Sequence, residues 1–170
     1  MGVESCVDSR ANCLRTIHEE HALIHDGKLF DFTDIQASLA FGASYSYAFQ
    51  CPAGAYPHLA VRVDCDKLFT VSLTEGATVS GGSAGTAYNR NRPSAITNNM
   101  TITKGVTPSG GTVIWTRKTI AGKIGDIINQ ELEWILKPLT STTYYVLTIT
   151  NNDGAASANV STDVSFYEFS

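Results

Sequence analysis

The sequence predicts an all-β protein: an antiparallel two-sheet sandwich with a jelly-roll-like strand order, preceded by an extended N-terminal arm. Three observations support this fold class. Only 16% of the 170 residues are charged, against about a quarter in ordinary soluble domains. Several stretches alternate apolar and polar residues with the two-residue period of a half-buried strand. Clusters of Gly, Pro, Asn and Asp separate these stretches, as turns do in sandwiches.

The N-terminal arm is predicted to span residues 1–33, and the β-sandwich domain residues 34–170. The arm mixes charges, shows no strand alternation and has only a weak helical stripe, so we expect an irregular segment with room for one helical turn. Phe30 and Phe32 at its end form either a short strand or an apolar anchor. Such a segment would dock on another surface.

Alternation defines the strands of the sandwich, and seven to nine are expected. The stretch from residue 76 to 111 is too long for a plain loop in a compact domain, so it should carry short strands. Residues 122–130 are ambiguous between a helical turn and a loop. The predicted strands are residues 41–50, 59–65, 69–73, 87–92, 100–104, 112–119, 144–150 and 158–166.

Two pairs of these strands are predicted to form β-hairpins. Residues 59–65 and 69–73 flank a tight turn at residues 66–67, and the last two strands flank the turn signal at residues 151–154. A two-stranded ribbon is marginal alone, so the remaining chain must cover its apolar face.

Charge and hydropathy exclude two classes of partner. The formal net charge of −4 argues against nucleic acid, which requires a basic footprint. No apolar run reaches the length of about 18 residues that a membrane span needs. The N-terminus lacks a secretory signal pattern, so we expect synthesis in a cytoplasm.

The sequence does not predict an enzyme, and no cofactor is expected. Ser83 sits in a Gly-x-Ser-x-Gly pattern, but the strand before it and the helix after it that a nucleophile elbow needs are not visible. Glu131 and Glu133 beside Trp134 could line a sugar site, although acidic residues more often flank a core tryptophan. No phosphate-binding or dinucleotide-binding motif is present.

Three histidines of the arm recur at helical spacing. His18, His21 and His25 would share one helical face at positions i, i+3 and i+7, which a structural metal could use. The spacing differs from the i, i+4 pair of zinc proteases, so we predict no metal site. Histidines that face solvent or a partner are the favoured interpretation, and at an interface they would make attachment sensitive to pH.

The four cysteines form no Cys-x-x-Cys pair, which argues against a zinc ribbon or a thioredoxin-type site. Cys51 and Cys65 lie in strand-like contexts and are predicted to be free thiols that pack as small hydrophobes. Cys6 and Cys13 lie in the polar arm. They are expected to be reduced in a cytoplasm and able to form disulfides between chains later, in an oxidising environment.

The most distinctive local motif runs from Asn89 to Arg92 and reads Asn-Arg-Asn-Arg. Arg90 and Arg92 would share a strand face and present forked donors for carboxylates or carbonyls. Two interpretations are equally supported: a contact between subunits, or an ion pair within one chain. The aspartates considered for the latter are Asp64, Asp126 and Asp163.

A set of short motifs resembles one known family. The chain resembles the small proteins that decorate, or cement, the capsids of tailed bacteriophages, over roughly residues 20–170. The resemblance implies a jelly-roll domain, a threefold assembly on the outer shell and no catalytic residues. The motifs that carry it are residues 21–30, Gly85-Thr86, residues 89–92, 133–137, 145–151 and 166–168.

The function expected from this resemblance is a structural virion protein that stabilises the capsid exterior. Its partners would be the major capsid protein and its own copies, as a homotrimer, with trimers gaining avidity from several arms. The alternative is a carbohydrate-binding adhesion module, in which Trp115, Trp134, Tyr88 or Tyr144 would stack on sugars. The residues expected to make the arm and interface contacts are Cys6, Cys13, His18, His21, His25, Phe30 and Phe32, with Arg90 and Arg92 between subunits.

Overall fold

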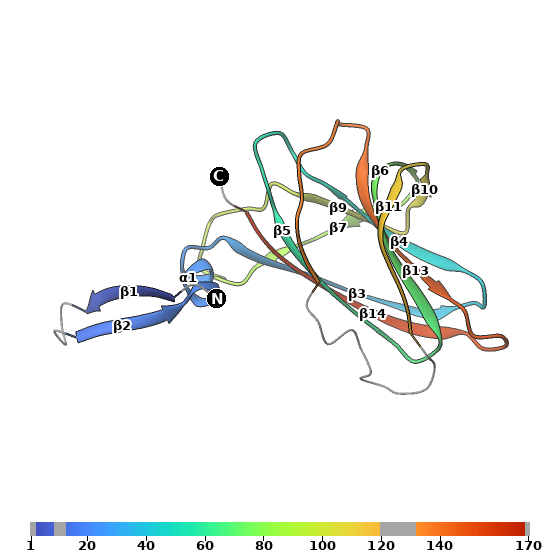
Figure 1. Ribbon diagram of the computed structural model, residues 1–170, viewed down its shortest axis with the longest axis horizontal. Helices are drawn as coiled ribbons and strands as arrows, with labels where there is room; N and C mark the ends of the chain where they lie inside the picture. Colours follow the sequence, from blue (N-terminus) through green and yellow to red (C-terminus); the bar gives the residue numbers. More distant parts are fainter. Residues whose placement is uncertain (1–2, 9–12, 120–131, 169–170) are drawn as a thin grey trace.

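The computed structural model describes residues 3–8, 13–119 and 132–168 (Figure 1). Fourteen strands and one short helix lie within this described part of the chain. In chain order they are β1 (Val3–Asp8), β2 (Cys13–His18), α1 (Glu19–His25), β3 (Leu29–Leu39), β4 (Ser44–Gln50), β5 (His58–Cys65), β6 (Phe69–Ser80), β7 (Ser83–Gly85), β8 (Tyr88–Asn89), β9 (Thr101–Lys104), β10 (Thr107–Ser109), β11 (Thr112–Thr119), β12 (Leu132–Ile135), β13 (Tyr144–Asn151) and β14 (Ala158–Tyr167).

The predicted sandwich is confirmed, and its strand order is that of a jelly roll. One sheet runs β12-β5-β14-β3, and the other runs β11-β6-β13-β4, with every pair antiparallel. Apart from β6 and β11, strands that follow one another among these eight lie in opposite sheets. This is the wrapping of two Greek keys over one core that defines the double-sheet jelly roll.

The insertion between β6 and β11 extends both sheets along the same side of the sandwich. β9 pairs with β4 and β7 pairs with β9, while β8 pairs with β3. The short strands expected near residues 87–92 and 100–104 are therefore present as β8 and β9. β10 returns to pair with the end of β6. The segment from residue 90 to 100 consequently runs past the start of β3, where the arm begins.

The core lies between the two sheets and is filled by the inward faces that the alternation predicts. β13 buries Tyr145, Leu147 and Ile149 in this way, and β14 buries every second residue from Ala158 to Phe166. The rings of Phe30 and Phe166 stack with their centroids 5.5 Å apart and join β3 to β14. The largest fully buried side chains are Tyr47, Phe30, Phe49, Phe166, Leu59, Leu73, Met100, Leu136, Leu147 and Ile149.

Both predicted hairpins are wrong in their pairing. β5 and β6 lie in different sheets, and so do β13 and β14, so each turn is a corner that carries the chain across the sandwich. At the second corner, buried Asn151 donates from Nδ2 to the carbonyls of Leu39 and Ala156 at 2.8 and 2.9 Å. The apolar–polar alternation correctly predicted which face of these strands is buried. It contains no information about which other strand pairs with each of them.

The arm also differs from its prediction. β1 and β2 form an antiparallel hairpin, followed by α1, where an irregular segment was expected. Among the described strands, β1 and β2 pair only with each other, so neither sheet of the sandwich imposes an inside–outside alternation on their sequence. Phe30 and Phe32 are each only 2% exposed within β3. They belong to the sandwich core, and the sandwich thus begins at Leu29 instead of residue 34.

Figure 1 shows the arm hairpin projecting from one end of the sandwich, beyond α1, while β11 lies at the opposite end. The ambiguous residues 122–130 lie outside the described part of the chain. Of the described residues, the helical ones in α1 are too few to cross a lipid bilayer.

Candidate functional site: the base of the N-terminal arm

The arm leaves the sandwich through α1 and a tight turn at Asp26 and Gly27. The amides of Asp26 and Lys28 donate to the carbonyls of Ala22 and Leu23, both at 2.9 Å, and close the end of the helix. Gly27 has a φ of +69°, a conformation that suits glycine. A Cβ atom added there would lie 2.3 Å from Oγ of Ser94, so glycine is also required sterically.

The Asn89–Arg92 motif holds this turn against the sandwich. Asn89 donates from Nδ2 to the carbonyl of Gly27 at 2.7 Å and to that of Ile96 at 3.0 Å. Asn91 donates from Nδ2 to the carbonyl of His25, at the end of α1, at 3.0 Å. The two asparagine amides therefore satisfy backbone carbonyls that the helix end leaves without helical partners. The motif fixes the direction in which the arm departs.

Arg90 makes an ion pair within the chain. Its Nε lies 2.5 Å from Oδ2 of Asp31 in β3, and its Nη2 donates to Oγ of Ser165 in β14 at 3.1 Å. Ser165 in turn donates to Oδ1 of Asp31 at 2.7 Å. The intramolecular interpretation is thus correct for Arg90, although Asp31 was not among the predicted partners.

The aspartates that the sequence suggested as partners are engaged or placed elsewhere. Asp64 pairs with Arg62 at 3.2 Å, Asp163 lies within β14, and Asp126 is outside the described residues. Arg92 lies over the ring of Tyr88, with its guanidinium carbon 5.3 Å from the ring centroid. Arg90 and Arg92 therefore have different roles. Arg90 connects β3 and β14 through Asp31 and Ser165, whereas Arg92 packs over the exposed ring of Tyr88.

Glu168 anchors the same insertion from the C-terminal side, a role that the sequence did not indicate. Its buried carboxylate accepts hydrogen bonds from the backbone amides of Asn99 and Met100, at 2.8 and 2.6 Å, and from Nδ2 of Asn99 at 2.9 Å. A lone Glu after a strand gives no signal of this in a sequence. The end of β14 and residues 89–100 thus form one unit around the base of the arm.

The histidines of the arm are placed differently from one another. His18 is the last residue of β2, whereas His21 and His25 lie on α1 with their Nε2 atoms 2.8 Å apart. Both helical side chains are exposed. Among the side chains that the structure describes, no group of three or more His, Cys, Asp or Glu residues could hold a metal ion.

The cysteines divide as the sequence suggested. Cys51 and Cys65 are free thiols, buried and half-buried respectively. Burial, followed by the nearby Glu168 carboxylate, raises the pKa of Cys51 to about 12, so its thiol is protonated and unreactive at neutral pH. In the arm hairpin Cys6 lies opposite Arg15 and Cys13 lies opposite Asp8. The two cysteines are therefore not backbone partners of each other.

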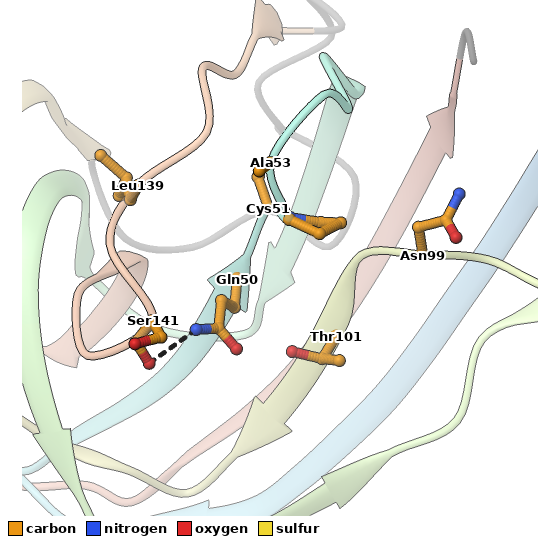
Figure 2. Close-up of a pocket in the computed structure, with 8 residues that line it drawn as sticks. Gln50, Cys51, Ala53, Asn99, Thr101, Leu139 and Ser141 are labelled. Atoms are coloured by element: carbon orange, nitrogen blue, oxygen red, sulfur yellow. Dashed lines mark hydrogen bonds between the residues drawn. The ribbon is translucent and has the colours of Figure 1, made fainter.

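A shallow surface pocket of about 320 Å³ lies beside this unit (Figure 2). Gln50 donates from Nε2 to the carbonyl of Ser141 at 2.7 Å, which joins two residues of its lining. The side chains around it supply no general base, and the thiol of Cys51 is held protonated. Nothing in its lining points to catalysis. The lining residues are Gln50, Cys51, Pro52, Ala53, Asn99, Thr101, Leu139 and Ser141.

The aromatic residues considered for sugar binding are mostly packed. The rings of Trp115 and Trp134 meet edge to face, 5.5 Å apart, and both pack against the core; Tyr144 is half-buried. Tyr88 is 58% exposed. Ser83 starts β7, a three-residue strand with no helix after it, so the elbow geometry is not formed. Glu131 and the side chain of Glu133 lie outside what the structure describes.

Comparisons with known proteins identify no relative: no family model, no curated protein and no solved structure matches the chain.

Proposed function

We propose that this chain is a structural virion protein that decorates and stabilises a bacteriophage capsid. In this proposal the jelly-roll body sits on the outer shell as a homotrimer, and the arm reaches onto the major capsid protein or a neighbouring copy. The observation that carries the proposal is the arm: a hairpin that projects from the sandwich, on a base held by Asn89, Asn91 and Gly27. A firm base on a projecting element suits attachment to another surface.

The composition of the surface also supports a structural role. The chain carries few charges, and the core lies enclosed between the two sheets of the jelly roll. Jelly rolls recur in viral shell proteins and in lectins, so the fold alone favours both candidate functions equally. The arm distinguishes them, because a glycan-binding site needs a rigid stacking surface rather than a projecting hairpin.

The rival function is carbohydrate binding through Tyr88. This ring is exposed and lies beside Arg92, which would offer donors to sugar hydroxyls. It is one ring rather than a platform, since Trp115 and Trp134 pack against each other. Tyr88→Ala separates the two functions: capsid binding should persist, whereas glycan binding should be lost.

Cryo-electron microscopy of the virus particle whose genome encodes the chain tests the proposal directly. Decoration predicts many copies at regular positions on the outer shell, with density for the jelly roll and the arm touching the shell. A few copies at a tail fibre would favour adhesion. Absence of the chain from the particle would contradict both.

A further inference from the structure

Among the strands that the structure describes, β11 is at the edge of its sheet. It pairs with β6, and no other strand in the described part of the chain pairs with its outer edge. Val113 and Ile114 on this strand are 58% and 43% exposed. An edge of this kind presents unpaired backbone groups and readily accepts another strand, which is why proteins usually shorten, charge or cover it.

The charges on β11 favour an acidic partner strand. Arg117 and Lys118 are exposed, neither forms an ion pair within the described residues, and β11 contains no acidic residue. Successive side chains of a strand point to opposite faces, so a strand added beside β11 would meet Arg117 on one face of the sheet and Lys118 on the other. Opposite charges across neighbouring strands stabilise pairing, and like charges oppose it.

β1 of the arm has the matching properties. Its sequence, VESCVD, contains Glu4 and Asp8 and no basic residue, and among the described strands it pairs only with β2. Glu4 and Asp8 share one face of β1, so in either orientation of that face they meet one of the two cations of β11. Six residues make a strand of about 20 Å, which fits within the eight residues of β11. β2 is the less suitable partner, because it contributes Arg15 and no acidic residue.

Geometry excludes pairing within one molecule, because the arm and β11 lie at opposite ends of the sandwich (Figure 1). We infer that β1 of one copy pairs with the outer edge of β11 in a second copy, by β-strand addition. The donor and acceptor surfaces differ, so the contact is heterologous and produces closed rings or extended chains of subunits. Its role as a link between neighbours rests on the proposed decoration function, but the contact is a property of the purified chain.

Paired charge reversals test this contact in the full-length protein. Analytical ultracentrifugation with reductant present, at low and at high salt, should show concentration-dependent association that weakens as salt increases. Arg117→Glu/Lys118→Glu should weaken association at least tenfold, and so should Glu4→Lys/Asp8→Lys. Each variant alone meets like charges at the contact, whereas an equimolar mixture of the two variants should associate again, because opposite charges then meet.

Arg62→Glu/Lys137→Glu is the matched control, because it makes the same change in net charge at two side chains that are at least 60% exposed and lie outside β11. It should leave association within about twofold of the unmodified chain, and circular dichroism should show the same fold in all variants. A chain that stays monomeric, a β11 reversal without effect, or a mixture that fails to associate would each overturn the inference.

Particle binding, measured separately by co-sedimentation with capsids, keeps this inference distinct from the proposed function. A monomeric chain that binds capsids would contradict the strand addition alone. An associating chain that binds no capsid would contradict decoration alone.

Discussion

Removing the negative charge of Glu168 should destabilise the protein measurably. Glu168 is 6% exposed, and its carboxylate accepts three short hydrogen bonds, one of them from the amide of Met100, a residue with no exposed surface. Hydrogen bonds to a charged group contribute about 1.5–3 kcal/mol each, but Asn99 is exposed and can bind water instead. The amide of Met100 cannot bind water instead, because Met100 is fully buried. We therefore expect Glu168→Ala to lower the free energy of unfolding by about 2–4 kcal/mol.

Glu168→Gln keeps the shape and one accepting oxygen, so its expected cost is smaller, about 1–2 kcal/mol. Urea denaturation followed by circular dichroism measures both values, and Glu75→Gln is the matched control. Glu75 pairs with Lys137, which is 63% exposed, so removing that charge should cost less than about 1 kcal/mol. A Glu168→Ala variant within 0.5 kcal/mol of the unmodified protein, a margin of about the size seen at ordinary surface positions, would refute this reasoning.

Three further predictions concern the arm base and the core. Gly27→Ala should loosen the arm, because an alanine in this left-handed backbone and in contact with Ser94 costs about 1–3 kcal/mol. Limited proteolysis should then cut the arm sooner than in the unmodified protein. Gly54→Ala is the control, because a Cβ atom at Gly54 would lie in open space. Arg90→Ala should lower thermal stability more than Arg92→Ala, since only Arg90 joins two strands; equal losses in calorimetry would contradict this. Stability should fall as pH rises above about 9, because Cys51 then ionises in the unfolded chain while burial holds its native pKa at about 12. The expected slope is about 1.4 kcal/mol per pH unit, and Cys51→Ser should reduce it.

The sequence predicted which face of each strand is buried more accurately than it predicted which strands pair with each other. The alternation in β13 and β14 identified the buried residues correctly because it reflects one strand's exposure to one core. It could not reveal that the turn at Asn151 crosses between sheets, since a hairpin and a sandwich corner require the same turn chemistry. Pairing depends on residues distant in sequence: β14 lies between β3 and β5.

The candidate site was predictable only in part. The Asn89–Arg92 motif was recognisable as unusual, and an intramolecular pair was one of two open interpretations for Arg90. Its partner Asp31 had been assigned to the arm, on the wrong side of the domain boundary. Glu168 was missed because hydrogen bonds to backbone amides leave no pattern of residue types. The positions of Cys6, Cys13 and His18 are consistent with an arm, while their contacts with a partner stay predictions.

The position of β14 has a consequence for how the protein folds during synthesis. β14 lies in the centre of its sheet, between a strand that begins at Leu29 and one that begins at His58. That sheet cannot be completed until β14 has left the ribosome, well after β3 and β5, and closure of such long loops is slow. The β1–β2 hairpin, by contrast, needs only local contacts. The local contacts of this hairpin can therefore form earlier in synthesis, but a two-stranded ribbon alone is marginal, and its base is fixed only once Asn89 and Asn91 are in place.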